Sequence, residues 1–145
     1  MINPLDHNPA EKLLIAFCKG YHNRNLPFIL ELFTQQTNVW GSGVDEYRVG
    51  HAELSEQLKR DWSQSEAGQI KIVRFVDSPK NSNWAAAICQ AHIIIEGQEH
   101  VFNDLRGTVT VEKENDIWKI AHMHASFPDY RNPVDGSFPD SKFAN

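Results

Sequence analysis

Residues 118–126 read Trp-Lys-Ile-Ala-His-Met-His-Ala-Ser, and two sets of side chains alternate along them. Alternation at period two is typical of a β-strand that has one face buried. Five residues share one face of such a strand: Trp118, Ile120, His122, His124 and Ser126. Because this set holds the larger aromatic and apolar groups, the pattern predicts that it faces the interior. His122 and His124 would then lie on the wall of an internal concavity.

Three stretches that read as strands precede this one, with turn-forming residues between them. They cover residues 69–77, 84–96 and 100–113, and a Ser-Pro-Lys-Asn-Ser-Asn turn separates the first two. Residues 84–96 are apolar on both faces, so the outer face of the sheet also needs a cover. A second copy of the chain is the simplest cover, and the pattern predicts a homodimer that forms through this outer face.

The first half of the chain shows helical spacing. Residues 8–11 read Asn-Pro-Ala-Glu, which is typical of a capped helix start. A second, shorter helix is expected over residues 25–33, a short strand over 37–43, and a third helix over 51–63. Helices followed by a meander of antiparallel strands predict an α+β fold, with the helices packed in the concavity of a curved sheet.

Composition and charge restrict the class of protein. The chain has 145 residues, of which 41% are hydrophobic and 23% charged, as in a single globular domain with its own core. The net charge is −5 and no block of Lys and Arg occurs, so we expect no nucleic-acid partner. No apolar run approaches the roughly 20 residues of a membrane span, and the polar start does not resemble a secretory signal. We therefore expect no membrane partner and a cytoplasmic location.

We divide this single domain, residues 1–145, into a core and an arm. The core covers residues 9–128, and residues 129–145 are rich in Pro and Gly, which predicts an extended C-terminal arm. Cys18 and Cys89 lie far apart in elements that we expect to be buried. Two packed, reduced thiols are the simpler interpretation, with a disulfide or a reactive thiol as the alternative.

The last strand and the strand before it resemble a known superfamily. Together with Arg-Gly-Thr-Val at residues 106–109, the strand 118–126 is similar to the end of nuclear transport factor 2-like domains. The similarity is strongest to the SnoaL-like group and to the association domain of calcium/calmodulin-dependent protein kinase II. It also covers Val-Trp-Gly at residues 39–41 and the Asp-Glu-x-x-x-Gly turn at residues 45–50, and it extends over residues 9–128.

The resemblance implies a cone-shaped, cystatin-like fold with a ligand-binding pocket between sheet and helices, and a dimer or higher oligomer. It implies no single reaction, because the superfamily includes isomerases, dehydratases, cyclases, epoxide hydrolases and non-enzymatic assembly domains. A ketosteroid-isomerase-like site needs a Tyr hydroxyl beside a protonated carboxyl group, and a second carboxylate as base. Tyr21 and Asp104 are present, but no matching motif surrounds them.

Two histidines are the candidate catalytic residues. His122 and His124 titrate near physiological pH and suit acid–base work or ligand contact, whereas a buried pair can also serve structure alone. A His-x-His strand can also hold a metal, but no third ligand at a recognisable spacing is visible, so we predict no metal site.

The candidate ligand-binding residues extend beyond these histidines. The full set is Tyr21, Trp40, Glu46, Trp62, Arg106, His122 and His124. Arg106 would bind an anionic group, or else pair with Asp104 or Glu46 or lie in solvent. Glu46 would reach the pocket mouth or belong to a solvated turn. The three aromatic residues would face the ligand or simply pack in the core.

Two hypotheses from different classes follow. The first is a small-molecule-binding pocket of the SnoaL-like type for a polar or anionic ligand, with cofactor-free proton-transfer chemistry of the isomerase or dehydratase kind. No nucleophile motif, phosphate loop or cofactor fingerprint occurs, so we expect no cofactor. The second is a non-catalytic dimerisation or oligomerisation module with a vestigial pocket. The sequence alone does not decide whether the protein is an enzyme.

Overall fold

Helix α1 (Pro9–His22) begins as the capping pattern predicts. In the computed structural model, which describes residues 6–139, the Asn8 side chain accepts a hydrogen bond from the Glu11 N–H, and the Glu11 carboxylate accepts one from the Asn8 N–H. The Asn8 amide also donates to Ser78 Oγ at 3.0 Å and to Ser82 Oγ at 3.1 Å. One buried side chain therefore caps the helix and fixes it to the loop at residues 76–83.

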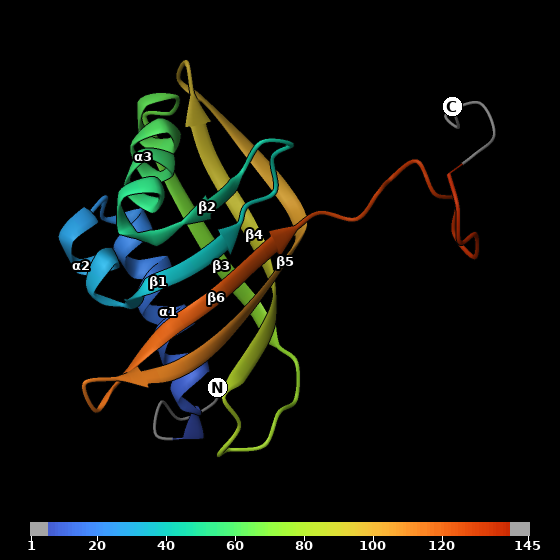
Figure 1. The fold of residues 1–145 in the computed structure, drawn as a ribbon. Coiled ribbons are helices and arrows are strands. Elements are labelled where there is room, and N and C mark those ends of the chain that lie inside the picture. The colour runs from blue at the N-terminus through green and yellow to red at the C-terminus, as the bar shows by residue number, and fades with distance from the viewer. Residues whose placement is uncertain (1–5, 140–145) are drawn as a thin grey trace.

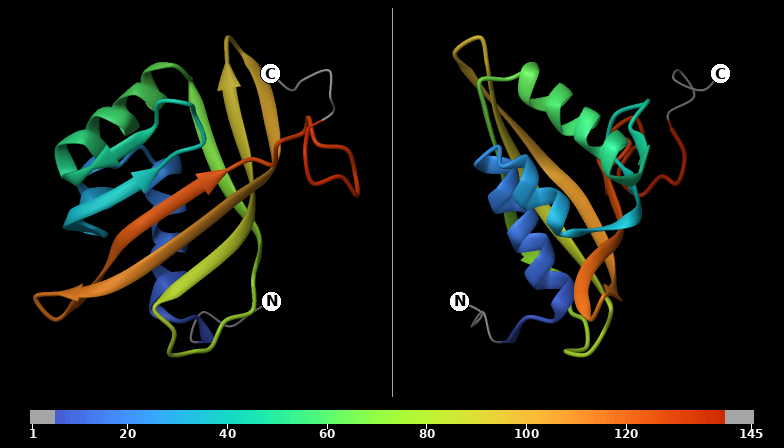
Figure 2. Two further views of the ribbon diagram at one scale, coloured as in Figure 1. Left: turned by 45° about the vertical axis from the view of Figure 1, so that its right-hand side comes forward. Right: turned by 60° about the vertical axis from the view of Figure 1, so that its left-hand side comes forward.

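Six strands form one curved sheet that wraps around the helices (Figures 1 and 2). The strands are β1 (Phe33–Trp40), β2 (Tyr47–Val49), β3 (Ala67–Phe75), β4 (Trp84–Ile95), β5 (Gln98–Glu114) and β6 (Ile117–Ser126). Their order is β2-β1-β6-β5-β4-β3, and the pairs are antiparallel except for the parallel pair of β1 and β6. Helices α2 (Leu26–Glu31) and α3 (Gly50–Ser63) lie with α1 on the concave side. The predicted α+β fold is confirmed.

The start of β1 differs from the prediction. The second helix was expected to include Phe33, and the strand was expected to begin at Thr37, but α2 ends at Glu31 and β1 begins at Phe33. Phe33 is fully buried, which suits either element, so burial alone did not indicate the boundary. The Leu32 carbonyl accepts a hydrogen bond from the Ile120 N–H at 2.7 Å, and this pairing with β6 begins the strand. The three-residue strand β2 was not predicted, because it is too short to show a period.

Strand β6 contains a β-bulge that interrupts its alternation. Ile120 pairs with Val111 of β5, and His122 pairs with Thr110, so Ala121 is an extra residue without a partner in the ladder. Ile120 is fully buried, but beyond the bulge it is Met123 that is buried, and His124 is exposed. The prediction that both histidines face the interior is therefore wrong, because it assumed unbroken alternation.

The core lies between α1, α3 and the concave face of the sheet. On β4 the burial alternates as expected, with Ala85, Ala87, Cys89 and Ala91 facing inward. Cys18 and Cys89 are both buried and free, which agrees with packed thiols. Burial disfavours the thiolate and raises the pKa of Cys18 to about 12 and that of Cys89 to about 11.

The chain leaves the sheet after β6 and extends away from the body (Figure 1). Tyr130 contacts the sheet through its hydroxyl, which donates to Asp104 Oδ2 at 3.1 Å. Of the arm that we expected at residues 129–145, the last six residues, 140–145, lie outside the described part of the chain. Within residues 6–139, no helix combines the length and the apolar character that a membrane crossing requires.

Candidate functional site

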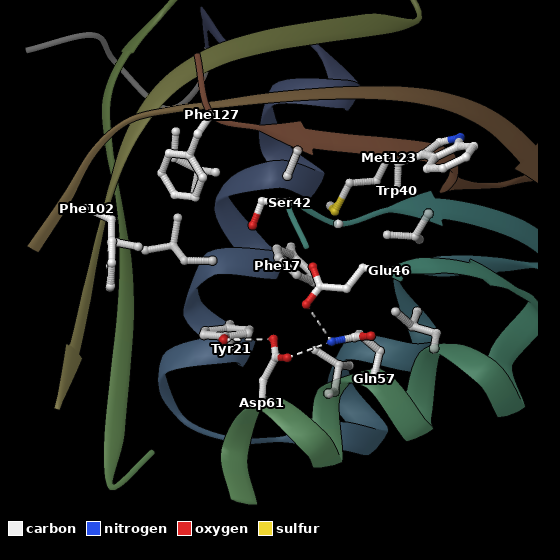
Figure 3. A pocket seen from close by; sticks show the side chains of 18 of the residues that line it. Phe17, Tyr21, Trp40, Ser42, Glu46, Gln57, Asp61, Phe102, Met123 and Phe127 are labelled. Atoms are coloured by element: carbon white, nitrogen blue, oxygen red, sulfur yellow. Dashed lines mark hydrogen bonds between the residues drawn. The ribbon is translucent and has the colours of Figure 1, made fainter. Parts of the chain in front are cut away.

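A cavity of about 380 Å³ lies between the helices and the concave face of the sheet (Figure 3). Sites for small molecules typically have volumes of about 300–1,000 Å³. Most of its walls are apolar, with side chains from α1, α3 and five strands: Phe17, Val39, Leu54, Leu58, Ile70, Ile93, Leu105 and Met123. Phe102 and Phe127 lie together in this wall, with ring centroids 6.3 Å apart. The cavity thus has the size and the lining of a small-molecule site.

Four polar side chains are connected at one end of the cavity (Figure 3). The Tyr21 hydroxyl donates to Asp61 Oδ2 at 3.0 Å. The side-chain amide of Gln57 donates to Asp61 Oδ1 at 2.7 Å and to Glu46 Oε1 at 3.1 Å. Gln57 therefore links two carboxylates, and one of these also accepts from a tyrosine.

Helix α3 positions Gln57 and Asp61. Both residues lie on the face of the helix that carries Leu54 and Leu58, because residues three or four apart are neighbours on a helix surface. Neither Gln57 nor Asp61 was among the residues predicted from the sequence to bind a ligand. The available signal was the presence of polar residues at positions where an amphipathic helix normally buries apolar ones.

A glycine-rich turn positions Glu46. The Gly43 N–H donates to Glu46 Oε2 at 2.7 Å, and the Gly41 N–H donates to the Glu46 carbonyl at 2.7 Å. A Cβ on Gly43 would lie 2.7 Å from the carboxyl carbon of Glu46, and one on Gly41 would also collide with this side chain. The turn therefore needs glycine at both positions to keep Glu46 folded against it.

The carboxylates differ in their electrostatic surroundings. Burial raises the pKa of Asp61, and the nearby Glu46 adds to this effect, although hydrogen bonds from Gln57 and Tyr21 oppose it. Glu46 lies 3.3 Å from the Arg60 guanidinium, which also forms a bidentate pair with Asp45 at 2.9 and 3.1 Å. Hydrogen bonding to Arg60 lowers the pKa of Asp45. Burial, followed by the neighbouring Asp61, raises the pKa of Tyr21. Asp61 is thus a carboxyl group whose pKa is raised at the polar end of the cavity.

The structure brings some of the predicted residues to the cavity. Tyr21 and Glu46 line its polar end. Trp40 lies at its margin, 48% exposed, with its ring 4.3 Å from that of Tyr47. Trp62 packs behind Tyr21, with ring centroids 6.0 Å apart, and is not part of the lining.

The other predicted residues lie on the outer face of the sheet. The bulge at Ala121 turns His122 and His124 away from the cavity, and His122 Nδ1 forms a hydrogen bond with Asn38 Oδ1. Arg106 lies opposite Ser126 in the ladder of β5 and β6, and its side chain is exposed. Exposure to solvent was one of the alternatives that the sequence left open for Arg106. None of the three is in the lining of the described cavity. Within residues 6–139, no group of three His, Cys, Asp or Glu side chains is arranged to hold a metal ion.

Tyr21 does pair with a carboxyl group, although not with the one considered from the sequence. Its partner is Asp61, whereas Asp104 accepts from Tyr130 at the base of the arm. Asp104 has a positive φ of 60° and lies where the pairing of β4 and β5 shifts register. The site thus contains a tyrosine, a partly buried carboxyl group and a second carboxylate.

The sequence model of the SnoaL-like domain matches residues 10–130, which is most of the chain. The chain belongs to the SnoaL-like domain family. This SnoaL-like domain is thereby a member of the nuclear transport factor 2-like superfamily, and its cystatin-like fold agrees with the resemblance. A search of curated proteins found no sequence match to it.

Solved structures share the fold of this SnoaL-like domain at low sequence identity. A protein of Novosphingobium aromaticivorans proposed as an aromatic ring hydroxylase has a TM-score of 0.71 at 19% identity, over 87% of this chain and 92% of its own. A proposed scytalone dehydratase of the same organism has a TM-score of 0.66 at 11% identity, over 79% and 78%. An epoxide hydrolase of M. tuberculosis has a TM-score of 0.65 at 14% identity, over 84% of each chain. At such identities the likeness establishes the fold.

Proposed function

We propose that this SnoaL-like domain binds an apolar small molecule in the cavity and that Asp61 exchanges a proton with it. The observation that carries the proposal is a partly buried carboxyl group at the polar end of an otherwise apolar cavity, hydrogen-bonded by Tyr21 and Gln57. Catalytic acids and bases are commonly found where burial and specific neighbours raise a pKa in this way.

The arrangement suits abstraction of a proton beside a carbonyl group. The Asp61 carboxylate takes a proton from a C–H bond of the ligand, and the electron pair of that bond moves into an enolate. Return of the proton to another carbon gives isomerisation. Transfer of the proton from Asp61 to a hydroxyl group on the adjacent carbon, which then leaves as water while the enolate electrons form a C=C bond, gives dehydration. Tyr21 and Gln57 each bond one oxygen of Asp61, which fixes the orientation of the carboxylate. Proton transfer of this kind contributes about 10²–10⁴-fold to a rate.

The comparisons support the reaction class without specifying it. Two of the similar structures are named as a dehydratase and an epoxide hydrolase, and both names describe chemistry on small organic molecules. The residues that carry the proposal in this chain are Asp61, Tyr21 and Gln57, because these contact the cavity. His122 and His124 have no part in it, since they lie on the opposite face of the sheet.

A non-catalytic assembly module is the second candidate. Trp40, Tyr47 and Val49 are all exposed on β1 and β2, and they favour a contact with another protein surface. In that case the cavity would bind a small molecule without turning it over, or would bind none.

The two candidates are separated by solvent exchange into a bound probe. α-Hydroxyacetophenone has an aromatic body, a hydroxyl group and acidic C–H bonds beside its carbonyl. In D₂O we expect the protein to accelerate deuterium incorporation at this carbon, measured by NMR. Asp61→Asn should reduce the acceleration by about 10²-fold or more while the probe still binds. Glu56→Gln, which removes an exposed carboxylate from the same helix, is the matched control and should change neither.

Two results would count against the proposal. Exchange in Asp61→Asn at the wild-type rate would remove Asp61 from the mechanism. Binding of the probe without accelerated exchange in the wild-type protein would favour the assembly module.

A further inference from the structure

At the polar end of the cavity, the donors of Tyr21, Gln57 and Gly43 are engaged within the protein, whereas the carboxylate acceptors are not saturated. From this we infer that the cavity selects molecules whose polar head is a primary ammonium group and whose body is apolar. The inference rests on the proposed binding function and adds the chemical class of the ligand.

The donors at this end each have an acceptor within the protein. The Tyr21 hydroxyl donates to Asp61 at 3.0 Å. The two N–H bonds of the Gln57 amide are directed at Asp61, 2.7 Å away, and at Glu46, 3.1 Å away. The Gly43 N–H is bonded to Glu46 at 2.7 Å. A ligand carboxylate, which only accepts, therefore finds no free hydrogen on these three groups, and the Ser42 hydroxyl, which also lines the cavity, forms no hydrogen bond within residues 6–139.

The acceptors at the same end are not saturated. An ionised carboxylate has about four lone-pair sites, and each Asp61 oxygen accepts one hydrogen bond from the residues described. An ammonium group has three donors and no acceptor, which is the complement of this surface.

Charge favours a cation over a neutral donor. Glu46 and Asp61 place two carboxylates at the end of an apolar cavity. Arg60 pairs with Glu46 at 3.3 Å but also with Asp45 at 2.9 Å, so its charge is shared. Within residues 6–139, Asp61 forms no ion pair within 4 Å and is held by neutral groups alone. A cation beside Asp61 therefore gains an attraction that surrounding apolar groups screen weakly.

The same features disfavour an anionic ligand. The sequence led us to expect an anion held by Arg106, but that side chain is exposed on the outer face of the sheet. A carboxylate in the cavity would meet Asp61 and Glu46 with no free cation beside it among the described lining residues. The apolar body of the ligand would instead lie towards Phe102 and Phe127, which are labelled away from Gln57 in Figure 3.

Three probes with one aromatic body separate these classes. 2-Naphthylmethylamine, 2-naphthalenemethanol and 2-naphthoate present an ammonium, a hydroxyl and a carboxylate group on the same ring system. We expect calorimetric titration at pH 7 to give a dissociation constant at least about tenfold lower for the amine than for the alcohol, and the weakest binding for the acid. Asp61→Asn and Glu46→Gln should each weaken amine binding about tenfold and change alcohol binding by less than about threefold.

Two further variants locate the effect. Glu56→Gln removes a charge from the exposed side of α3 and should leave all three affinities unchanged. Ala125→Phe fills the cavity and should abolish binding of all three probes, with Ala91→Phe as a second variant if the first does not fold. Circular dichroism of each variant checks that the fold is retained.

The results of these titrations distinguish the preference for an ammonium head group from the proposed binding of small molecules in the cavity. Equal binding of amine and alcohol, or an amine preference that survives in both Asp61→Asn and Glu46→Gln, overturns the inference and leaves the cavity as a binding site. Loss of the preference in Glu56→Gln also overturns it, because the effect would then come from net charge. If no probe binds, or if the cavity-filling variants bind all three, the proposed function fails as well.

Discussion

Asp61 differs from an exposed aspartate in how readily it holds a proton. Burial raises its pKa above the ordinary 3.8, so the folded state binds the proton more tightly than the unfolded chain does. The free energy of unfolding therefore decreases as the pH rises from 3.8 through the raised pKa, and the penalty is fully present above that window. This pH dependence of the free energy of unfolding is opposite to that expected from a carboxylate stabilised by an ion pair, such as Asp45.

A pH series of melting temperatures tests this assignment. Asn at position 61 does not titrate, so the melting temperature of Asp61→Asn relative to wild type should rise by a few degrees between about pH 3.5 and about pH 7. The variant also loses a hydrogen bond. This loss lowers its melting temperature at both pH values and therefore does not contribute to the change between them. Glu56→Gln, at an exposed position of the same helix, should show no such rise. A relative melting temperature that falls with pH would mean that Asp61 is stabilised as a carboxylate.

At the scale of single residues, the sequence indicated Tyr21 and Glu46 but not Asp61. The two that were found are a tyrosine near the end of a helix and a glutamate after a glycine-rich turn, both in positions with a recognisable local pattern. Asp61 lies three residues after Leu58, near the C-terminal end of α3, and a charged residue at such a position is usually expected in solvent. Its contact with Tyr21 joins α3 to α1, and no local pattern reports a contact between residues so far apart in sequence.

Among the elements, β6 shows what alternation does and does not predict. The strand itself occupies Ile117–Ser126, very close to the predicted bounds, because its composition and the flanking turns are local signals. The bulge at Ala121 is not local. Thr37, fully buried on β1, donates its hydroxyl to the Ala121 carbonyl at 3.2 Å, so a residue far away in sequence supports the irregularity.

Substitution of Thr37 tests this support. Thr37→Val keeps the shape of the side chain but removes the hydroxyl, which leaves the Ala121 carbonyl without this partner. We expect a loss of about 1–3 kcal/mol in the free energy of unfolding, measured by urea denaturation. Thr37→Ser keeps the hydroxyl and removes one methyl group, so the free energy of unfolding should decrease by only about 1 kcal/mol. A Thr37→Val protein as stable as wild type would show that the hydroxyl does not support the bulge.

For the whole molecule, the order of helices and strands was predictable and the outer contacts of the sheet were not. Helix caps, turn clusters and the two-sided strand β4 follow from residue types that are adjacent in sequence. Which side chains face outward on β6 and β1 depends on the register between them, and the pairing of these strands is irregular between Phe33 and Asn38. The outer face therefore carries His122 and His124, whereas the sequence led us to expect both at the ligand, and Trp40 lies exposed at the margin of the cavity.

This outer face leads us to propose that the protein forms a homodimer through it. Trp40, Tyr47 and Val49 are exposed there, next to the smaller side chain of Thr108. Light scattering at micromolar concentration should give twice the mass of one chain. Thr108→Arg introduces a charge where β5 faces outward and should yield a monomer. Val44→Arg, in the fully exposed turn before β2, is the control and should remain dimeric. A wild-type monomer at this concentration contradicts the proposal.

The unpaired Ala121 also changes how this strand should be read against its relatives. A relative whose strand pairs without this bulge would carry the same letters in the same order, yet its histidines would reach the opposite side of the sheet. An alignment that matches histidine to histidine would then equate a ligand contact in one protein with a surface residue in the other. For such pairs, roles are transferred safely only after the ladder partners of each residue have been compared.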